Sequence, residues 1–435
     1  MRNEIREYNI KIVEQAILAN KGVKAARRKV MDGKKLMVAI RDNNGNIITD
    51  RGKIVQRCAG FYGKLYSSTI DRPTTSRTHR HPVPQVTCSE VENALKYMSN
   101  GKVPGPDGLV IELIKESGPE VWKRLAALFS KCIESSTVPS DWNEGSIVLL
   151  HKKGDIKDIN NYRPISLLCH IGKLFSKIIL SRLEETLDFN QSREQAGFRK
   201  GFSTTDHLQV LTQLMEKTNE YEVPMCLAFI DYEKAFDSVE HVGIINAIRI
   251  NGINEIYLDL LTHVYNNGYA TIKMDAESPK FPIRRGVRQG DTISPKLFNA
   301  GLEDVFQRLE WETVGLRVNG ENISHLRFAD DIVLIGNTSS ELQTMINQLN
   351  EESNKLGMKM NMKKTKVMFN KFTRQAEVQV NGAVIEKVEE YVYLGQLVTI
   401  QNDKTDEIKR RIVAGWIAFN KNRDLMKSKM PMCLK

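Results

Sequence analysis

The sequence predicts an α+β fold built from short buried strands and longer helices. The stretch Leu326-Arg-Phe-Ala-Asp-Asp-Ile-Val-Leu-Ile335 places two adjacent carboxylates between two apolar runs. Its second run, 332–335, is rich in β-branched residues and too short for an independent helix, which is typical of a buried strand. A second short apolar strand, Met225-Cys-Leu-Ala-Phe-Ile230, is followed directly by Asp231. Longer segments are predicted to be helices at 120–137, 170–188, 204–220 and 341–355.

The two acidic strand ends are the main functional signal. Charge at the end of a packed sheet is costly unless it is solvated, paired or bound to a metal. A single Asp-Asp turn is usually a solvated hairpin, but here a second strand brings another carboxylate. Two such strands can hold paired divalent ions about 3.5–4 Å apart, the arrangement that contacts both oxygens in a phosphoryl transfer. Carboxylates without thiolate or imidazole partners favour Mg²⁺ or Mn²⁺.

The composition indicates a nucleic-acid partner and an intracellular protein. A chain of 435 residues can form one to three domains, and its net charge of +10 suits a polyanionic partner. The six cysteines are scattered without a Cys-x-x-Cys pair, which argues against a zinc site and a secreted disulfide scaffold. No apolar run approaches transmembrane length, and the charged N-terminus is not a signal peptide. We therefore expect no membrane partner and a location in the nucleus and cytoplasm.

The first 86 residues are predicted to form a basic N-terminal region and a linker. A basic helical region is followed by a hairpin that turns at Asn43-Asn-Gly45. The segment 71–85 is rich in Pro, Thr, Arg and His and is predicted to be extended. Thr87-Cys-Ser-Glu90 then has the pattern of a capping box, so a helix should begin there.

The last part of the chain is predicted to contain short strands at 363–369 and 377–380 and then a helix. Apolar residues repeat at helical spacing in this final segment, and basic residues occupy its other face. We expect the helix to pack by the apolar stripe and to expose the charged face. The stripe consists of Ile408, Ile412, Trp416 and Phe419.

Four segments, in one order along the chain, carry a family resemblance. They are Asn161-Tyr-Arg-Pro-Ile-Ser-Leu167, Phe229-Ile-Asp-Tyr-Glu-Lys-Ala-Phe-Asp237, Gly286-Val-Arg-Gln-Gly-Asp-Thr-Ile-Ser-Pro295 and Phe328-Ala-Asp-Asp331. The set resembles the palm of reverse transcriptases, in particular the non-LTR (LINE-type) retrotransposon branch. The resemblance implies a right-hand polymerase with fingers, a palm of antiparallel sheet with helices packed on one face, and a partial helical thumb. Residues 87–395 would form fingers and palm, and 396–435 the start of a thumb that we expect to be cut short.

The resemblance also implies an activity and its central residues. The activity is RNA-directed DNA polymerisation, in which deoxynucleotides are added to the 3′ end of a DNA primer on an RNA template. Asp231 and Asp330 would ligate two Mg²⁺ or Mn²⁺ ions, the backbone carbonyl of Tyr232 would be a further ligand, and Asp331 would complete the acidic cluster. Because clustered carboxylates repel each other, at least one should have a raised pKa without metal.

The family pattern assigns further residues to the incoming nucleotide. Phe236 would lie under the sugar and exclude a 2′-hydroxyl, although it can also be read as a core aromatic. Gln289 and Gly290 would lie against the nascent base pair, since a glycine lets backbone approach a ligand closely. Asp237 is interpreted differently, because Asp237-Ser-Val-Glu240 has the pattern of a helix N-cap.

Basic residues would contact the phosphates. Lys152, Lys153 and Arg163 flank two strand-like runs that can form a fingers hairpin, and one lysine together with Arg163 would meet the triphosphate. Lys364 or Lys366 would lie near the leaving pyrophosphate, and the sequence leaves the choice open.

A segment near the end of the palm would contact the primer. Tyr391-Val-Tyr-Leu-Gly-Gln396 resembles the primer grip, with Leu394 and Gly395 in its tight turn.

Two other functions are compatible with the same residues. An inactive or co-opted remnant of a retroelement would bind RNA without polymerising, and a group II intron maturase would use a similar palm for splicing. Intact Asp231, Asp330 and Asp331 favour a polymerase. The sequence leaves the oligomeric state and the presence of a separate endonuclease open.

Overall fold

The computed structural model describes residues 37–74, 81–274, 276–421 and 423, and the predicted helical region before residue 37 lies outside them. The chain divides into two compact units. The first comprises Met1–Ile54, Lys153–Asn161 and Thr405–Lys435, and the second comprises Val55–Lys152 and Tyr162–Lys404.

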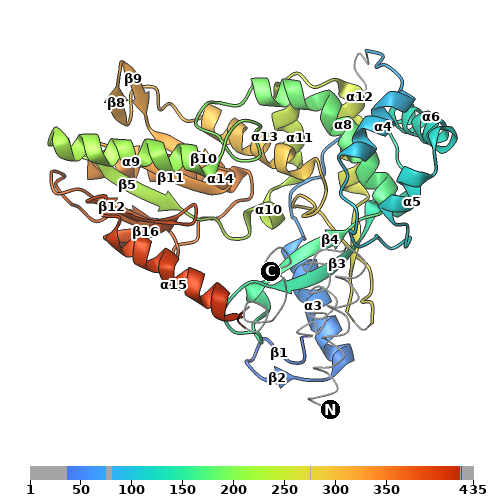
Figure 1. The fold of residues 1–435 in the computed structure, drawn as a ribbon, viewed down its shortest axis with the longest axis horizontal. Helices are drawn as coiled ribbons and strands as arrows, with labels where there is room; N and C mark the ends of the chain where they lie inside the picture. Colours follow the sequence, from blue (N-terminus) through green and yellow to red (C-terminus); the bar gives the residue numbers. More distant parts are fainter. Residues whose placement is uncertain (1–36, 75–80, 275, 422, 424–435) are drawn as a thin grey trace. The chain divides into compact units, whose positions relative to one another are not determined.

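The second unit contains a five-stranded sheet in the order β10-β11-β5-β12-β15. Strands β10, β11, β5 and β12 are labelled in Figure 1. Strand β5, Cys226–Ile230, is buried along its whole length and pairs with an antiparallel neighbour on each side. This position explains the apolar run, because both faces of the strand are covered. The neighbours that complete the sheet are β10 (His325–Phe328), β11 (Asp331–Gly336), β12 (Lys366–Phe369) and β15 (Glu386–Lys387).

Both faces of this sheet are packed. Alternate β5 residues, such as Ala228 and Ile230, share one apolar cluster with residues of three helices, α11 (His241–Ile250), α13 (Ser294–Gln307) and α14 (Ser339–Lys355). Leu227 and Phe229 belong to a second cluster on the opposite side. Helix α9 (Thr204–Glu220) and a hairpin of β16 (Glu390–Tyr393) and β17 (Gln396–Thr399) supply that cluster. The expected α+β fold, with helices packed on one face of the sheet, is confirmed, and helix α9 packs on the other face as well.

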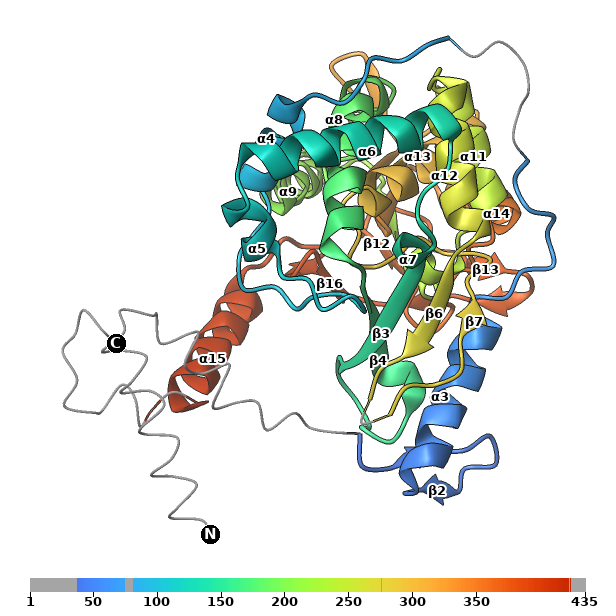
Figure 2. The same ribbon diagram turned by 90° about the vertical axis from the view of Figure 1, so that its right-hand side faces the viewer.

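A second sheet has the order β4-β3-β6-β7 (Figure 2). Strands β3 (Glu144–His151) and β4 (Tyr162–Leu167) form the antiparallel hairpin predicted from their apolar runs. Strand β6 (Tyr269–Ile272) pairs in parallel with β3, and β7 is Phe281–Pro282. Other helices of the second unit are α4 (Cys88–Lys96), α5 (Ile111–Glu116), α6 (Pro119–Ser135), α7 (Ser140–Asn143), α8 (His170–Phe189), α10 (Ala235–Ser238) and α12 (Glu255–Asn266).

One further helix includes residues of both units, and several other elements are short. This helix is α3 (Arg51–Leu65), and the short elements are η1 (Ile159–Asn161), β8 (Leu316–Val318), β9 (Glu321–Ile323), β13 (Gln379–Val380) and β14 (Ala383–Val384).

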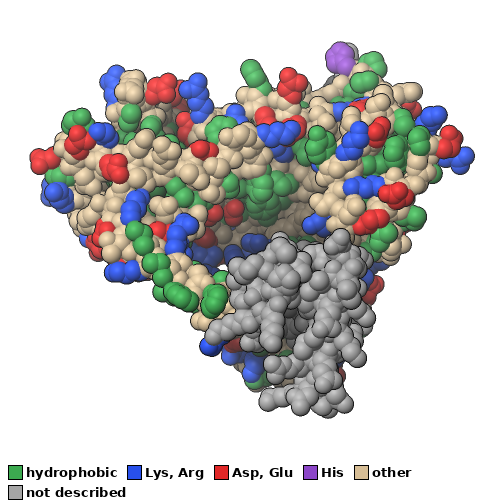
Figure 3. Space-filling view, viewed as in Figure 1, with side chains coloured by type: hydrophobic (Ala, Val, Ile, Leu, Met, Phe, Trp, Pro, Cys, Tyr) green, Lys and Arg blue, Asp and Glu red, His purple; other side chains and the backbone are tan. Residues whose placement is uncertain are grey.

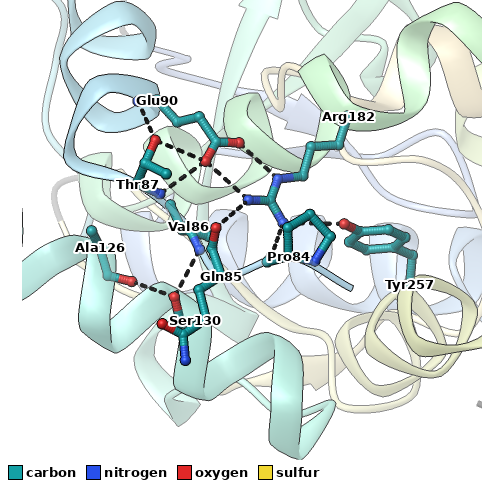
Figure 4. Close-up of polar contacts among 9 residues, drawn as sticks. All are labelled: Pro84, Gln85, Val86, Thr87, Glu90, Ala126, Ser130, Arg182 and Tyr257. Atoms are coloured by element: carbon teal, nitrogen blue, oxygen red, sulfur yellow. Dashed lines mark hydrogen bonds and ion pairs between the residues drawn. The ribbon is translucent and has the colours of Figure 1, made fainter. Parts of the chain in front are cut away.

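The capping box at the start of α4 forms as predicted. Its Glu90 is bound by Arg182, whose set of hydrogen bonds we call the Arg182 anchor. Thr87 Oγ1 accepts from the Glu90 amide at 3.2 Å, and Glu90 accepts from the Thr87 amide at 2.9 Å. Arg182 of α8 donates to Glu90 at 2.7 Å, to the Pro84 carbonyl at 2.7 Å and to the Tyr257 hydroxyl at 3.2 Å (Figure 4). One guanidinium thus fastens the end of the extended segment to three helices.

The first unit contains the predicted hairpin and the predicted last helix. Strands β1 (Ile40–Arg41) and β2 (Ile47–Ile48) pair around the expected turn. Helix α15 spans Thr405–Lys421, but its apolar stripe is exposed, with Ile408 58% and Trp416 61% accessible. The predicted inward packing of this stripe is therefore wrong for the described structure. None of the described helices has the length and apolar character needed to cross a membrane.

Candidate active site

The Asp-Asp sequence forms a tight turn between β10 and β11. Phe328 pairs with Asp331, so Ala329 and Asp330 occupy the two turn positions. Ala329 has a left-handed φ of 57°, as the favoured two-residue hairpin turns require at their first position.

A buried glutamine from a distant segment fixes this turn. Gln195 Oε1 accepts from the Ala329 amide at 3.0 Å and from the Gly197 amide at 2.8 Å. A Cβ on Gly197 would lie 2.3 Å from the Ala329 nitrogen, so only glycine fits. Sequence reasoning missed Gln195 and Gly197, because nothing local indicates a contact with a hairpin more than 130 residues away.

The sheet register brings the three predicted acids together. Ile230 of β5 pairs with Ile332 of β11, so continuing the antiparallel register by one step places Asp231 opposite Asp331. Neighbouring strands lie about 5 Å apart. Asp330 stands next to this pair in the turn, and it is half-buried whereas Asp331 is exposed. Two strands therefore deliver three carboxylates to one end of the sheet.

The negative charge of this cluster is only partly compensated. Partial removal from water, followed by the charges of Asp330 and Asp231, raises the pKa of Asp331 to about 6. Removal from water and the charge of Asp231 also raise the pKa of Asp330, although nearby Lys152 and Arg163 act to lower it. The predicted raised pKa in the acidic cluster is thus confirmed.

The structure distinguishes the two candidate lysines. Lys364 Nζ donates to both carboxylate oxygens of Asp231, at 3.0 and 3.2 Å. Lys366 is the first residue of β12 and instead pairs with Glu386 of β15 at 2.5 Å. Lys364 is therefore the lysine that belongs to the acidic cluster.

The donor set suits a hard divalent cation. Three carboxylates whose charge is only partly compensated provide the oxygen ligands that Mg²⁺ prefers. Backbone hydrogen bonds join this segment to residues 359–361 through the Asp231 carbonyl and the Glu233 amide. They do not involve the Tyr232 carbonyl. Within the described ranges, however, no three acidic, histidine or cysteine side chains are arranged as a metal-binding group. The Lys364 ammonium supplies the positive charge at Asp231 in this arrangement.

Phe236 follows Asp231 by five residues and lies at the edge of the core. Its ring is half-buried and stacks on Phe298, with centroids 4.3 Å apart and planes at 15°. Phe198 contacts it edge-on at 6.0 Å. One side of the Phe236 ring is thus supported by the core, as both interpretations of this residue require.

The loop that contains Gln289 and Gly290 is docked onto β4. The Ser166 amide donates to the Gln289 carbonyl at 2.8 Å. Gly290 has φ 117°, and a Cβ there would lie 2.7 Å from the Ser166 carbonyl oxygen. Arg288, next to them, is buried and donates to the Trp142 and Val264 carbonyls at 3.0 and 3.1 Å. The loop therefore holds Gln289 at a fixed backbone position.

Asp237 does not cap a helix, contrary to the sequence interpretation. It lies inside α10, and the N-cap of α11 is Glu240. Its buried carboxylate accepts from the Tyr66 hydroxyl at 2.9 Å and from Gln289 Nε2 at 3.1 Å. Burial is the main cause that raises its pKa to about 6. The capping pattern was misleading because tertiary donors take the carboxylate away from the local backbone.

The predicted phosphate-binding residues fall into two groups. Lys152 follows β3 and Arg163 lies on β4, and both are exposed with charges that act on Asp330. Lys153 belongs to the first unit, and its contact with the triphosphate stays a prediction. Figure 3 shows acidic and basic side chains gathered in a hollow in the middle of one face.

The predicted primer-contact turn forms at the tip of a hairpin. Leu394 and Gly395 connect β16 and β17 with φ of 45° and 84°. Tyr391 of β16 stacks on Phe229 with centroids 4.3 Å apart. Burial, then the charges of Asp231 and Asp331, raises the pKa of Tyr391 to about 12. The primer role of this turn stays a prediction.

An antiparallel sheet that presents clustered carboxylates beside a basic hairpin defines the palm of a right-hand polymerase. Residues 150–398, more than half of the chain, match the reverse transcriptase (RNA-dependent DNA polymerase) family. The chain therefore belongs to the reverse transcriptase family, and its relatives place it in the non-LTR retrotransposon branch.

Two curated relatives illustrate the likeness. The Retrovirus-related Pol polyprotein from type-1 retrotransposable element R2 of Popillia japonica is 28% identical over 289 residues, covering 66% of this chain and 39% of the relative. The RNA-directed DNA polymerase from mobile element jockey of Drosophila melanogaster is 26% identical over 325 residues, covering 72% and 35%. This chain thus spans less than half the length of either relative.

Among solved structures, apo telomerase from Candida tropicalis, truncated from its C-terminal domain, aligns with a TM-score of 0.44 at 13% identity. The alignment covers 66% of this chain and 60% of the telomerase chain.

Proposed function

We propose that this chain is an RNA-directed DNA polymerase that adds deoxynucleotides to a primer 3′ end on an RNA template. The main observation behind this proposal is the register of β5 and β11, which sets Asp231 opposite Asp331, with Asp330 in the adjoining turn. Membership of the reverse transcriptase family supports the same activity. We also propose that residues 87–395 act as fingers and palm, with the thumb beginning at 396.

Two Mg²⁺ or Mn²⁺ ions, held by Asp231, Asp330 and the Tyr232 carbonyl, would supply charge neutralisation at the attacking and leaving oxygens. Asp331 would add negative charge that favours their binding. Lys152 and Arg163 would bind the triphosphate, with the arginine offering its planar fork and the lysine a point charge. Lys364 would leave Asp231 and hold its protonated Nζ near the leaving pyrophosphate.

The residues around the base and sugar would set substrate choice. Phe236, backed by Phe298, would close the space that a 2′-hydroxyl needs. Gln289 and Gly290 would face the nascent base pair, and the Leu394–Gly395 turn would hold the primer end. Positioning of this kind supplies much of the catalysis in phosphoryl transfer.

A primer-extension assay tests the proposal. Purified chain with an RNA template, a DNA primer, dNTPs and Mg²⁺ should extend the primer, and chelation of the metal should stop extension. The same assay with Asp330→Ala controls for a contaminating polymerase. RNA binding without any extension by the wild-type chain would instead identify a non-catalytic remnant.

A further inference from the structure

Tyr66, Asp237 and Gln289 come from separate parts of the second unit and are linked by hydrogen bonds. The Tyr66 hydroxyl donates to Asp237 Oδ1 at 2.9 Å, and Gln289 Nε2 donates to the same oxygen at 3.1 Å. Tyr66 follows α3, Asp237 lies in α10, and Gln289 lies in the loop before α13. Tyr66 also lies outside residues 150–398, the part of the chain that matches the family.

Backbone contacts fix how these segments sit against each other. The Val287 amide donates to the Phe236 carbonyl at 2.8 Å, and the Arg284 amide donates to the Tyr66 carbonyl at 2.9 Å. A Cβ on Gly286 would lie 2.7 Å from the Asp237 carbonyl oxygen, so the loop and α10 are in close contact. With the main chain held, the torsions of the Gln289 side chain decide where its amide points.

The chemistry of Asp237 selects one orientation of that amide. An ionised carboxylate only accepts hydrogen bonds, so it can bind the NH₂ group of a glutamine and not the carbonyl oxygen. With a pKa of about 6, Asp237 is mostly ionised at neutral pH. Gln289 must therefore turn Nε2 toward Asp237 and direct Oε1 away from it. The Tyr66 hydroxyl is a second donor that stabilises the ionised acid.

A buried carboxylate at this place is costly for the fold. Burying a charge disfavours the folded state unless hydrogen bonds or counter-charges offset it. The raised pKa shows that the two donors and the nearby charges of Lys234 and Arg163 offset it incompletely. Retaining a costly acid is reasonable where orientation of a functional side chain is gained.

We propose that Tyr66 and Asp237 are positioning residues that fix the orientation of the Gln289 amide toward the incoming nucleotide. The inference rests on the proposed polymerase function. It extends the nucleotide site to a residue that precedes the matched family region. It also couples Gln289 to the residue next to Phe236, so one segment sets both the sugar contact and the loop.

The first test compares two tyrosines of the same region. Tyr66→Phe removes only the hydroxyl that binds Asp237. Tyr62→Phe is the matched control, because Tyr62 is also buried and its hydroxyl donates to the Tyr162 carbonyl, at 3.4 Å, rather than to Asp237. We expect Tyr66→Phe to raise the KM for dNTPs roughly three- to tenfold, with kcat and primer–template affinity within about twofold of wild type.

A double-mutant cycle separates positioning from general structural damage. In a Gln289→Met background, Tyr66→Phe should add no further increase in KM, because the side chain it orients is absent. Equal effects of Tyr66→Phe and Tyr62→Phe, or a full additional increase in the Gln289→Met background, would overturn the proposal.

A spectroscopic measurement keeps the inference testable without catalysis. In protein labelled with ¹⁵N-glutamine, the Gln289 side-chain amide is assigned by its loss in Gln289→Met. Its resonance should shift and its exchange with water should accelerate in Tyr66→Phe but not in Tyr62→Phe. An unchanged resonance in Tyr66→Phe refutes the inference. A wild-type chain that extends no primer refutes the proposed function alone, since the amide spectrum still reports the contact.

Discussion

The Arg182 anchor and the carboxylate cluster both gather charged groups within the second unit, but they are built in opposite ways. At Arg182, a cation meets an acid, two carbonyls and a hydroxyl, and almost every polar atom has a partner. Burial acts to raise the pKa of Glu90, yet the hydrogen bonds from Arg182 lower it overall. At the end of β5 and β11, like charges converge and the pKa of Asp331 rises.

The difference distinguishes a cluster that stabilises the fold from one whose charge is suited to binding a cation. Matched charges with full hydrogen bonding stabilise one arrangement of the chain, and removing one partner leaves the rest unpaired. Unmatched like charges destabilise the free protein and favour a cation, which is a property of a binding site. The same residue types therefore have opposite roles because their partners differ. The predictions below test this contrast, beginning with the largest expected effect.

Asp330→Ala should reduce primer extension by about a thousandfold or more, because it removes an expected metal ligand. Asp330 is a half-buried turn residue, and its removal relieves the repulsion among the acids, so the unfolding temperature and RNA affinity should stay close to those of wild type. Steady-state extension, thermal unfolding and filter binding on the same preparation check this. A matching loss of RNA binding would show that Asp330 is structural. The carboxylate cluster would then not differ in role from the Arg182 anchor.

Arg182→Met should lower the free energy of unfolding by about 3 kcal/mol, because it leaves Glu90 and two carbonyls without their donor. Extension per folded molecule at low temperature should be unchanged. Lys96→Met is the control, since the Lys96–Glu92 pair is exposed and should contribute less than about 1 kcal/mol. Urea unfolding measures both. A small effect of Arg182→Met would mean that its hydrogen bonds are replaced by water without loss.

Asp237→Asn should change how stability depends on pH. The folded pKa of Asp237 is about 6 against a reference of 3.8, so protonation stabilises the wild-type fold below about pH 4, and this contribution is lost as the pH rises through 6. Relative to the variant, wild type should lose up to roughly 3 kcal/mol between pH 4 and 7. Urea unfolding of both proteins across this range measures the difference. A stability difference that does not change with pH would show that the Asp237 carboxylate is not buried in its ionised form.

Phe236→Val should increase the use of ribonucleotides relative to deoxynucleotides by about tenfold, by opening space next to the sugar. Phe236→Tyr keeps the ring and should leave the ratio near wild type. Single-nucleotide incorporation with matched dNTP and NTP gives the two kcat/KM values. If Phe236→Val leaves both the ratio and the rate unchanged, Phe236 is only a core aromatic and does not contact the sugar of the nucleotide.

Local sequence signals were sufficient for much of the fold. The apolar run before Asp231 gave a buried strand, and the Thr87–Glu90 pattern gave a capping box that forms with both hydrogen bonds. These features depend on neighbours within a few residues. The α15 stripe and the Asp237 cap were misjudged because helical spacing and capping patterns do not say which tertiary partner is present.

The sequence by itself determined the chemistry of this site: the Asp231, Asp330 and Asp331 carboxylates, the Phe236 ring and the Gln289 loop. Only the tertiary structure decided which of these groups meet. Pairing of β5 with β11 sets Asp231 opposite Asp331. In the turn before β12, Lys364 and not Lys366 binds Asp231. Tyr66 and Gln289 are linked because both donate hydrogen bonds to Asp237. Such contacts join residues far apart in the chain. They form because the buried apolar faces fix the strand register, and no local pattern records that packing.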